Sequence, residues 1–215
     1  MAWAHKDDKL AEFRQSKGLR ASASVLTVSR LVRQNRVDRL IQAAALLRQT
    51  HPDVKVIIVG DGPDLPRLQS LTSSLALTTN ILFLGAIYDE EDLAPWFQAA
   101  TVFCYPQNIG LSLLHAFGYG LPVVTSDAVA CHNPEIAALE PNVNGLMYQH
   151  ASIEDLASKL RVVFDSPELR QRLSAGALRT VEEEYTLKRM VDGLETAIRF
   201  AHKHPRRPTQ NVRRH

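Results

Sequence analysis

Short apolar runs alternate with segments of helical periodicity along most of this chain, and this alternation constrains its fold more than any other feature. Six apolar runs predict strands over 24–29, 54–59, 81–84, 102–105, 122–125 and 145–148. Helices are predicted over 37–49, 65–75, 89–100, 110–119, 133–139, 153–164, 167–184 and 186–202. Runs that are apolar throughout are typical of strands covered on both faces, and connections of this length suit right-handed crossovers. The sequence therefore predicts an α/β, doubly wound, mostly parallel six-stranded sheet of the Rossmann-like type.

The predicted domain covers residues 24–204, between a polar lead-in over 1–23 and a basic tail over 205–215 that we expect to be disordered. The lead-in lacks the apolar segment of a secretory signal, and no apolar run is long enough to predict a membrane span, so a cytoplasmic location is expected. Without the five positive charges between residues 202 and 215, the net charge of +2 becomes −3. That balance argues against a nucleic-acid partner.

Three polar segments follow predicted strands at the edge where open parallel sheets bind ligands. Arg30 follows the first strand, and the turn of Gly60, Asp61 and Gly62 follows the second. The fourth strand is followed by Gln107, Asn108, Ile109, Gly110 and Leu111, which open a predicted helix. Their shared placement is stronger evidence for a ligand site than any one of them alone.

The residue types in these segments suit an anionic ligand. Gly110 and Leu111 fall at a helix N-terminus, where free N–H groups favour an anion and the missing Cβ of glycine allows close approach. His115, one turn deeper, can bond a ribose or sugar hydroxyl. The guanidinium of Arg30 suits a pyrophosphate. Arg36 could assist, whereas Arg33 and Arg39 are expected to be solvated. The alternatives are a glycine needed only for a tight turn and a surface arginine.

Several other chemistries lack their sequence motifs. The turn at residues 60–63 matches neither the dinucleotide fingerprint nor a P-loop, and no Gly-x-Ser-x-Gly elbow occurs. The histidines and two cysteines have no metal-ligand spacing, so no metal is expected. Cys104, Trp96 and Phe97 are interpreted as core residues.

Nine short motifs, in order, carry a family resemblance that runs from about residue 25 to 185. They lie at 28–31, 37–43, 57–63, 82–85, 99–103, 110–114, 119–124, 134–136 and 144–146. Together they resemble the C-terminal, donor-binding domain of a GT-B-fold glycosyltransferase of glycosyltransferase family 4 (glycosyl transferases group 1). The resemblance implies transfer of a sugar from a nucleotide-diphosphate donor to an acceptor, with no cofactor and no metal.

The same resemblance implies roles for individual residues. Arg30 would be catalytic, by stabilising the departing diphosphate, and the backbone at Gly110 and Leu111 would bind phosphate and sugar. The loops after Gly60 and Gly85 would frame the base and ribose. The predicted substrate-binding residues are Gly60, Asp61, Gly62, Gln107, Asn108, Ile109, Gly110, Leu111, His115, Arg36 and Glu135.

Two departures from the family pattern concern this site. Gln107 and His115 stand at the positions of a frequent Glu-x7-Glu pair, although residues 106–111 with His115 resemble a subgroup that reads Pro-Gly-Asn-Val-Gly-Leu with a following histidine. Asn35 stands where a phosphate-binding lysine is common, and Arg36 is the residue that could compensate.

The resemblance also implies an N-terminal GT-B domain that binds the acceptor, and nothing in this chain matches it. We therefore expect a fragment that binds a nucleotide-sugar, with an unknown acceptor and weak or no turnover alone. In the parent fold the last helix crosses to the other domain, so part of its apolar face is expected to be exposed. The alternatives are a non-catalytic interaction module and a nucleotide-sugar epimerase-like protein.

Overall fold

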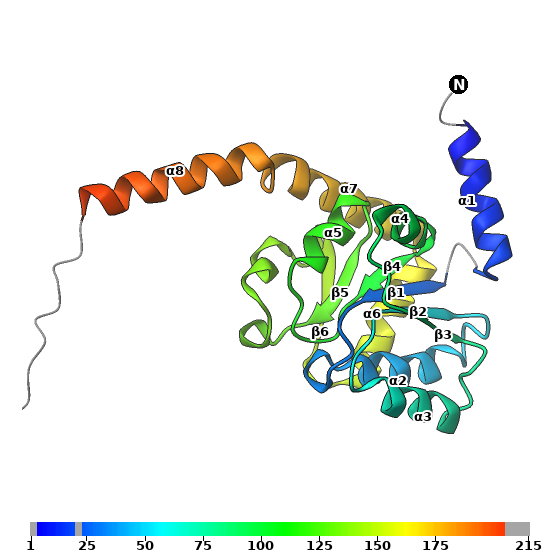
Figure 1. The fold of residues 1–215 in the computed structure, drawn as a ribbon. Coiled ribbons are helices and arrows are strands. Elements are labelled where there is room, and N and C mark those ends of the chain that lie inside the picture. The colour runs from blue at the N-terminus through cyan, green and yellow to red at the C-terminus, as the bar shows by residue number, and fades with distance from the viewer. Residues whose placement is uncertain (1–3, 20–22, 205–215) are drawn as a thin grey trace, which may run out of the picture.

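A single six-stranded parallel sheet forms the centre of the computed structural model, which describes residues 4–19 and 23–204 (Figure 1). Its strands are β1 Ser24–Val28, β2 Lys55–Val59, β3 Ile81–Gly85, β4 Val102–Cys104, β5 Val123–Ser126 and β6 Gly145–Tyr148. Their order across the sheet is β3-β2-β1-β4-β5-β6, and every neighbouring pair is parallel. The predicted fold class is confirmed. The order reverses direction between β1 and β4, which is where such sheets bind ligands.

Helices cover both faces of this sheet. They are α1 Ala4–Ser16, α2 Val37–Leu47, α3 Leu65–Ser74, α4 Glu90–Ala99, α5 Ser112–Gly118, α6 Ile153–Asp165, α7 Pro167–Glu183 and α8 Leu187–Lys203, with 3-10 turns η1 Arg33–Asn35, η2 Val129–Cys131 and η3 Pro134–Ala138. Figure 1 shows α2 and α3 below the sheet and α4 and α5 above it. Helix α6 packs beside α2, and α7 beside α5.

The alternation of side chains along the strands explains the two layers of core. Val25, Val56 and Ile58 belong to the cluster under α2, α3 and α6, whereas Leu26 and Ile57 belong to the cluster under α4, α5 and α7. All five are buried. The strands are thus apolar throughout because each face of the sheet is covered.

Two predicted helices differ from the structure in their start or in their type, whereas the others differ only by one or two residues at their ends. The helix expected over 110–119 is α5, which starts at Ser112, so Gly110 and Leu111 precede it. It ends before Gly120, whose φ of +65° is accessible to glycine at little cost. The segment expected to be a helix over 133–139 is the 3-10 turn η3.

The segment that precedes β1 forms helix α1 and packs on α4. Phe13 meets Trp96 edge to face at 5.0 Å, and Arg14 donates hydrogen bonds of 3.1 Å each to the carbonyl oxygens of Gln98 and Ala99. These bonds satisfy carbonyls at the C-terminal end of α4, which lack intrahelical partners. The predicted basic tail over 205–215 lies outside the described residues.

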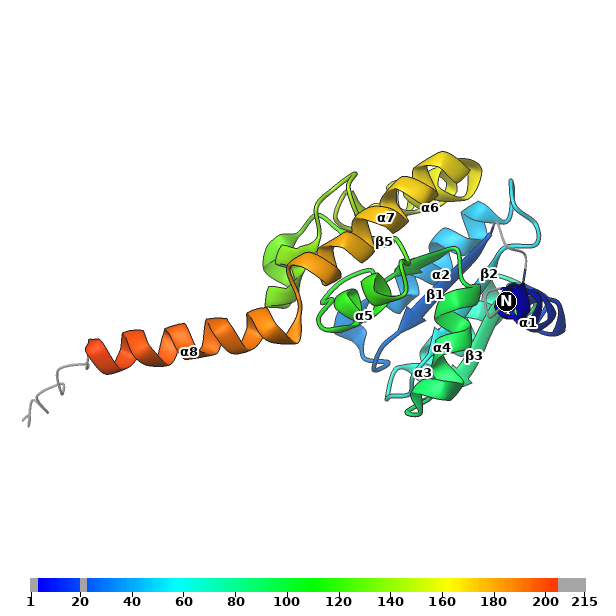
Figure 2. The same ribbon diagram turned by 90° about the horizontal axis from the view of Figure 1, so that it is seen from above.

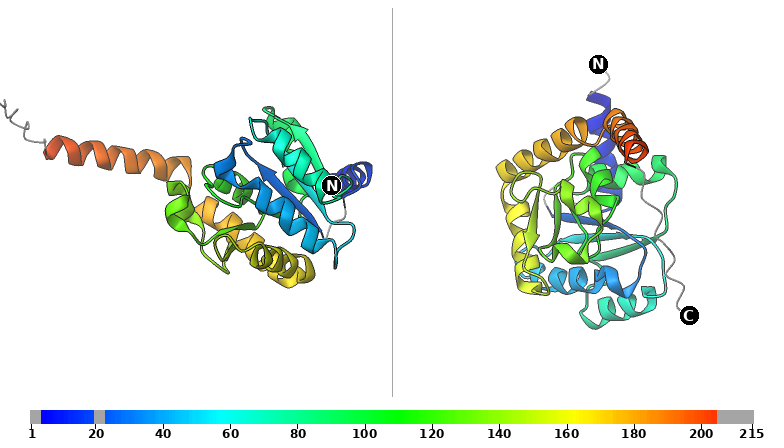
Figure 3. Two further views of the ribbon diagram at one scale, coloured as in Figure 1. Left: turned by 90° about the horizontal axis from the view of Figure 1, so that it is seen from below. Right: turned by 90° about the vertical axis from the view of Figure 1, so that its left-hand side faces the viewer.

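Helix α8 leaves the body of the domain (Figures 2 and 3). None of its residues is buried. Its large apolar side chains are all exposed, namely Leu187, Met190, Val191, Leu194, Ile198 and Phe200. The apolar face predicted to be exposed on the last helix is therefore present. No helix within the described ranges is long and apolar enough to cross a membrane.

Candidate functional site

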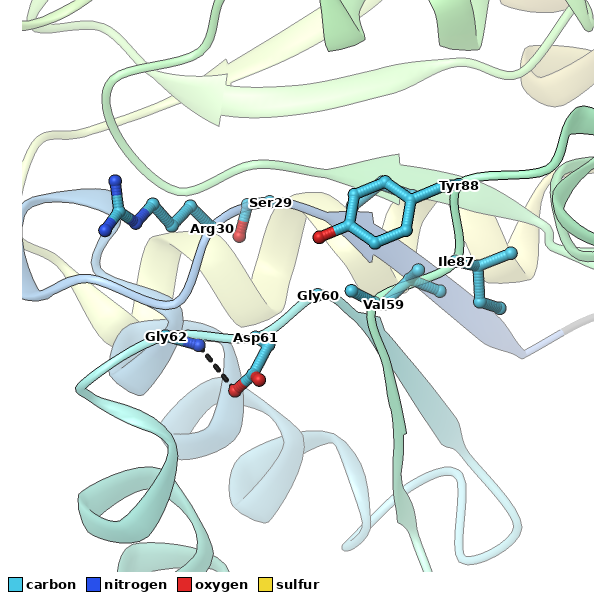
Figure 4. Close-up of a pocket in the computed structure, with 10 residues that line it drawn as sticks. Ser29, Arg30, Val59, Gly60, Asp61, Gly62, Ile87 and Tyr88 are labelled. Atoms are coloured by element: carbon cyan, nitrogen blue, oxygen red, sulfur yellow. Dashed lines mark hydrogen bonds between the residues drawn. The ribbon is translucent and has the colours of Figure 1, made fainter.

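A cavity of about 630 Å³ opens at the carboxyl ends of β1, β2 and β3 (Figure 4). Its lining residues come from the ends of these strands and the loops that follow them: Val28, Ser29, Arg30, Val59, Gly60, Asp61, Gly62, Ala86, Ile87 and Tyr88. The structure thus brings together Arg30 and the Gly60–Gly62 turn, which sequence reasoning placed at one edge of the sheet. Arg30 and Tyr88 lie at opposite ends of this cavity.

The two glycines of the turn are required by the approach of the neighbouring loop. A Cβ on Gly60 would lie 1.8 Å from the carbonyl oxygen of Ser29, and one on Gly62 would lie 2.3 Å from that of Leu31. The loops are joined by a 2.9 Å hydrogen bond from Leu31 N–H to the Asp61 carbonyl. The side chain of Asp61 turns back to accept a 2.7 Å bond from Gly62 N–H. Gly60 and Gly62 therefore have a packing role whether or not a ligand binds.

Arg30 is exposed at the rim of the cavity, and its backbone is held in place. Its carbonyl accepts a 2.7 Å hydrogen bond from Asn35 Nδ2 and a 3.0 Å bond from Val32 N–H. Among the ion pairs of the described residues, none includes Arg30. The guanidinium is consequently available to an anionic ligand.

Positive charge near Arg30 is distributed differently from the prediction. Arg36 binds both carboxylate oxygens of Asp38 at 3.1 Å, so its charge is already partly offset. Arg33 is solvated as predicted, with a side chain 81% exposed and Asp64 at 3.9 Å. Arg39 contradicts its prediction: it is only 5% exposed, because α2 turns it under the loop that follows β4.

That loop, residues 105–111, is held by contacts on both sides. Arg39 Nη1 donates to Gln107 Oε1 at 3.2 Å, and the buried Tyr148 hydroxyl donates to the Pro106 carbonyl at 2.9 Å. Asn108 has a left-handed φ of +67° and Ile109 is buried. Gly110 and Leu111 then lead into α5, and the Gly110 carbonyl accepts a 2.9 Å hydrogen bond from Leu113 N–H at the start of that helix.

His132 and Asn133 contact the same loop from beyond β5. The ring nitrogen Nδ1 of His132 accepts a 3.2 Å hydrogen bond from Ile109 N–H, and Nε2 lies 3.0 Å from the Ser126 carbonyl. Since Nδ1 must accept and Nε2 must donate, the ring is neutral in one tautomer. Burial is the main cause that lowers the pKa of His132, aided by the charge of His150 and opposed by the bond to Ser126.

His115 lies apart from the Arg30 cavity lining and binds Glu90 at 3.0 Å through Nε2. Tyr119 donates to the same carboxylate oxygen. Tyr119 and then His115 hold the pKa of Glu90 below its usual value, whereas burial and Glu90 raise the pKa of Tyr119 to about 12. Any ligand bound by His115 would share it with Glu90.

Two further side chains, Glu135 and Tyr88, concern the prediction of the site. Glu135 lies in η3 with a buried Oε2 that has no hydrogen-bond partner. Tyr88, which sequence reasoning did not select, is 96% exposed and extends over the cavity (Figure 4). The signal that could have found it is an aromatic residue in the loop after the third strand.

Within the described ranges, no group of three or more His, Cys, Asp or Glu side chains could hold a metal. Cys104 is buried as predicted.

Comparison with known proteins places this arrangement in a family. In sequence, the chain is similar to the GDP-mannose-dependent alpha-(1-6)-phosphatidylinositol monomannoside mannosyltransferase of Mycolicibacterium smegmatis. The two are 34% identical over 132 residues, covering 57% of this chain and 34% of that protein. The chain spans about half the length of the first curated relatives it matches.

Solved structures share the fold. HepE of Anabaena in complex with UDP superposes with a TM-score of 0.78 at 19% identity, covering 90% of this chain and 53% of that one. The C-terminal domain of the glycosyl transferase group 1 family protein LpcC from Francisella tularensis gives a TM-score of 0.70 at 22% identity, covering 82% of this chain and 92% of that one. The family model "Glycosyl transferases group 1" matches residues 10–180. Since that match covers well over half of the chain, the chain belongs to the glycosyl transferases group 1 family.

Proposed function

We propose that this chain is the C-terminal, donor-binding domain of a GT-B glycosyltransferase of family 4, and that it binds a nucleoside-diphosphate sugar for transfer to an acceptor. The observation that carries the proposal is the cavity that Arg30, which has no ion pair among the described residues, lines together with the Gly60–Gly62 turn and Tyr88. The likeness to a solved C-terminal domain and to a structure with bound UDP supports it.

The chemistry follows from the placement of the groups. A nucleobase would lie against Ile87 and Tyr88, where the exposed ring offers a stacking surface. The diphosphate would then reach Arg30 and the backbone N–H groups of Gly110 and Leu111. These donors would stabilise the negative charge that develops on the departing diphosphate. The reaction proposed here uses neither a cofactor nor a metal.

Other parts of the proposal concern what lies outside this site. The acceptor would be bound by an N-terminal GT-B domain, which accounts for the half-length match to the curated relatives. We also propose that the protein is located in the cytoplasm, as expected from the sequence. A non-catalytic module with the same fold, or an epimerase-like protein, is the rival function.

Calorimetric titration of the chain with UDP, GDP and their glucose and mannose derivatives tests the proposal. We expect saturable binding of at least one nucleoside diphosphate at or below millimolar concentration, weakened about tenfold or more by Arg30→Ala. Arg33→Ala is the matched control, because Arg33 is a nearby solvated arginine outside the cavity lining. Binding that is unchanged in Arg30→Ala would favour the non-catalytic module, and the absence of binding to every nucleotide would refute the proposal.

A further inference from the structure

Three asparagines from three loops form one chain of amide hydrogen bonds that ends on the backbone of Arg30. Asn133 Nδ2 lies 3.4 Å from Asn108 Oδ1, Asn108 Nδ2 donates to Asn35 Oδ1 at 2.9 Å, and Asn35 Nδ2 donates to the Arg30 carbonyl at 2.7 Å. Asn133 Nδ2 also lies 3.2 Å from the Asn108 carbonyl. The loops after β5, β4 and β1 are thereby joined.

The direction of this chain is fixed at its end. The Arg30 carbonyl can only accept, so Asn35 must present its NH2 group there and its oxygen to Asn108. Asn108 must in turn present its NH2 group to Asn35 and its oxygen to Asn133. Reversal of any one amide would place two oxygens or two NH2 groups face to face.

Burial and backbone conformation make Asn35 and Asn108 hard to replace. Asn35 is 3% exposed, so loss of its partner would leave a buried polar group unsatisfied. Asn108 holds a left-handed φ of +67°, which asparagine tolerates better than most residues. The neighbouring bond from Ile109 N–H to His132 fixes the loop at a second point.

We propose that this amide chain sets the position of Arg30 relative to the N–H groups of Gly110 and Leu111, and that Asn35 is its central positioning residue. Asn35 carries no charge and does not line the cavity, so it acts on the ligand only through Arg30 and the loop after β4. Donors held in advance of binding stabilise a diphosphate better than donors that must be ordered by it. This inference rests on the proposed donor site.

The test compares the affinity of the whole chain for UDP and UMP, and for GDP and GMP, by calorimetry. Asn35→Ala and Asn108→Gly should each reduce the affinity advantage of the diphosphate over the monophosphate by about tenfold. Glycine at 108 keeps the left-handed backbone accessible while it removes the amide. Combined with Arg30→Ala, Asn35→Ala should cause a smaller further loss than it causes alone, because part of its effect passes through Arg30.

Asn80→Ala is the matched control. Asn80 is also buried, and its Nδ2 donates to two backbone carbonyls, those of Pro52 and Val54, but it precedes β3 at the opposite edge of the sheet. The Asn80→Ala chain should be less stable than the wild-type chain, but its affinity advantage for the diphosphate over the monophosphate should be unchanged. If folded Asn108→Gly or Asn35→Ala keeps the wild-type advantage, or if Asn35→Ala and Arg30→Ala are additive, the inference is overturned while the donor site stands. If the wild-type chain binds no nucleoside diphosphate, both proposals fail.

Discussion

Arg39 donates from Nη1 to Gln107 Oε1 at 3.2 Å, so an arginine that is 5% exposed binds a neutral amide where a carboxylate would complete an ion pair. No described acidic residue forms an ion pair with Arg39. A buried cation without a counter-charge is costly, and its neighbour Tyr148 stays neutral because burial raises its pKa to about 12. The position of Gln107 is therefore sensitive to charge.

Gln107→Glu should stabilise the domain at neutral pH. The new carboxylate would replace a neutral hydrogen bond by a charge-assisted one, for a gain of about 1–2 kcal/mol and a rise in Tm of about 3–6 °C. Its folded pKa would be depressed, so the gain is present above the unfolded pKa of about 4.3 and is lost as pH falls through the folded pKa. Thermal denaturation of Gln107→Glu and the wild-type chain at pH 7 and pH 3.5 measures this gain in stability. The gain should vanish when Arg39→Met is added. An unchanged Tm of Gln107→Glu at pH 7 would contradict the pairing of residue 107 with Arg39.

Gly60→Ala should separate the loops after β1 and β2. Because the added Cβ would lie 1.8 Å from the Ser29 carbonyl oxygen, backbone must move, and we expect a loss of about 3 kcal/mol or more in the free energy of unfolding. Gly193→Ala in α8 is the control, since nothing lies within 4 Å of its Cβ, and it should change that free energy by less than about 0.5 kcal/mol. Urea denaturation compares the two, and equal stabilities would show that the close approach is not required.

His132 should make the domain less stable in mild acid. Its pKa is lowered by burial, so between the folded pKa and the unfolded value of about 6.5 the unfolded chain binds more protons. Stability therefore rises with pH across that window and is lost as pH falls below about 6.5. His132→Gln, which can accept from Ile109 and donate to Ser126 without titrating, should flatten the difference between urea denaturation at pH 7.5 and pH 5.5. An identical pH dependence in both proteins would remove His132 as the cause.

Helix α8 should contribute little to the stability of the body. None of its residues is buried, so deletion of residues 187–215 should change Tm by less than about 2 °C. Leu173→Ala in α7, where the side chain is fully buried, should by contrast cost about 2–5 kcal/mol. A large loss of Tm on deletion of α8 would mean that its apolar face packs on the domain in solution.

Local pattern predicted the sheet and the edge that carries the site, because both depend on residues close together in sequence. Arg30 and Gly60–Gly62 were placed by the strands that they follow, and parallel strands bring their carboxyl ends together. The roles assigned to these residues, and to Glu135 and His115, stay predictions.

Contacts between distant segments could not be predicted in this way. Arg39 lies between apolar residues of an amphipathic helix, and only the docking of α2 under the loop after β4 buries it against Gln107. The amide chain depends on asparagines at 35, 108 and 133, whose proximity follows from the strand order and not from any local pattern. Segment 133–139 has an apolar pattern that suits a helix, but it forms a 3-10 turn that starts at Pro134.

Backbone amide shifts of the isotopically labelled chain, followed by NMR during titration with UDP and with GDP, test the central claim most directly. The account predicts saturable shifts that cluster at residues 29–31, 60–62, 86–88 and 108–111, and that weaken together in Arg30→Ala. A second hollow of about 600 Å³ near Asn144, Thr180 and Tyr185 provides the internal comparison. Shifts confined to that hollow, or no saturable shift at millimolar nucleotide, would contradict the assignment of a nucleoside-diphosphate site to the carboxyl edge of the sheet.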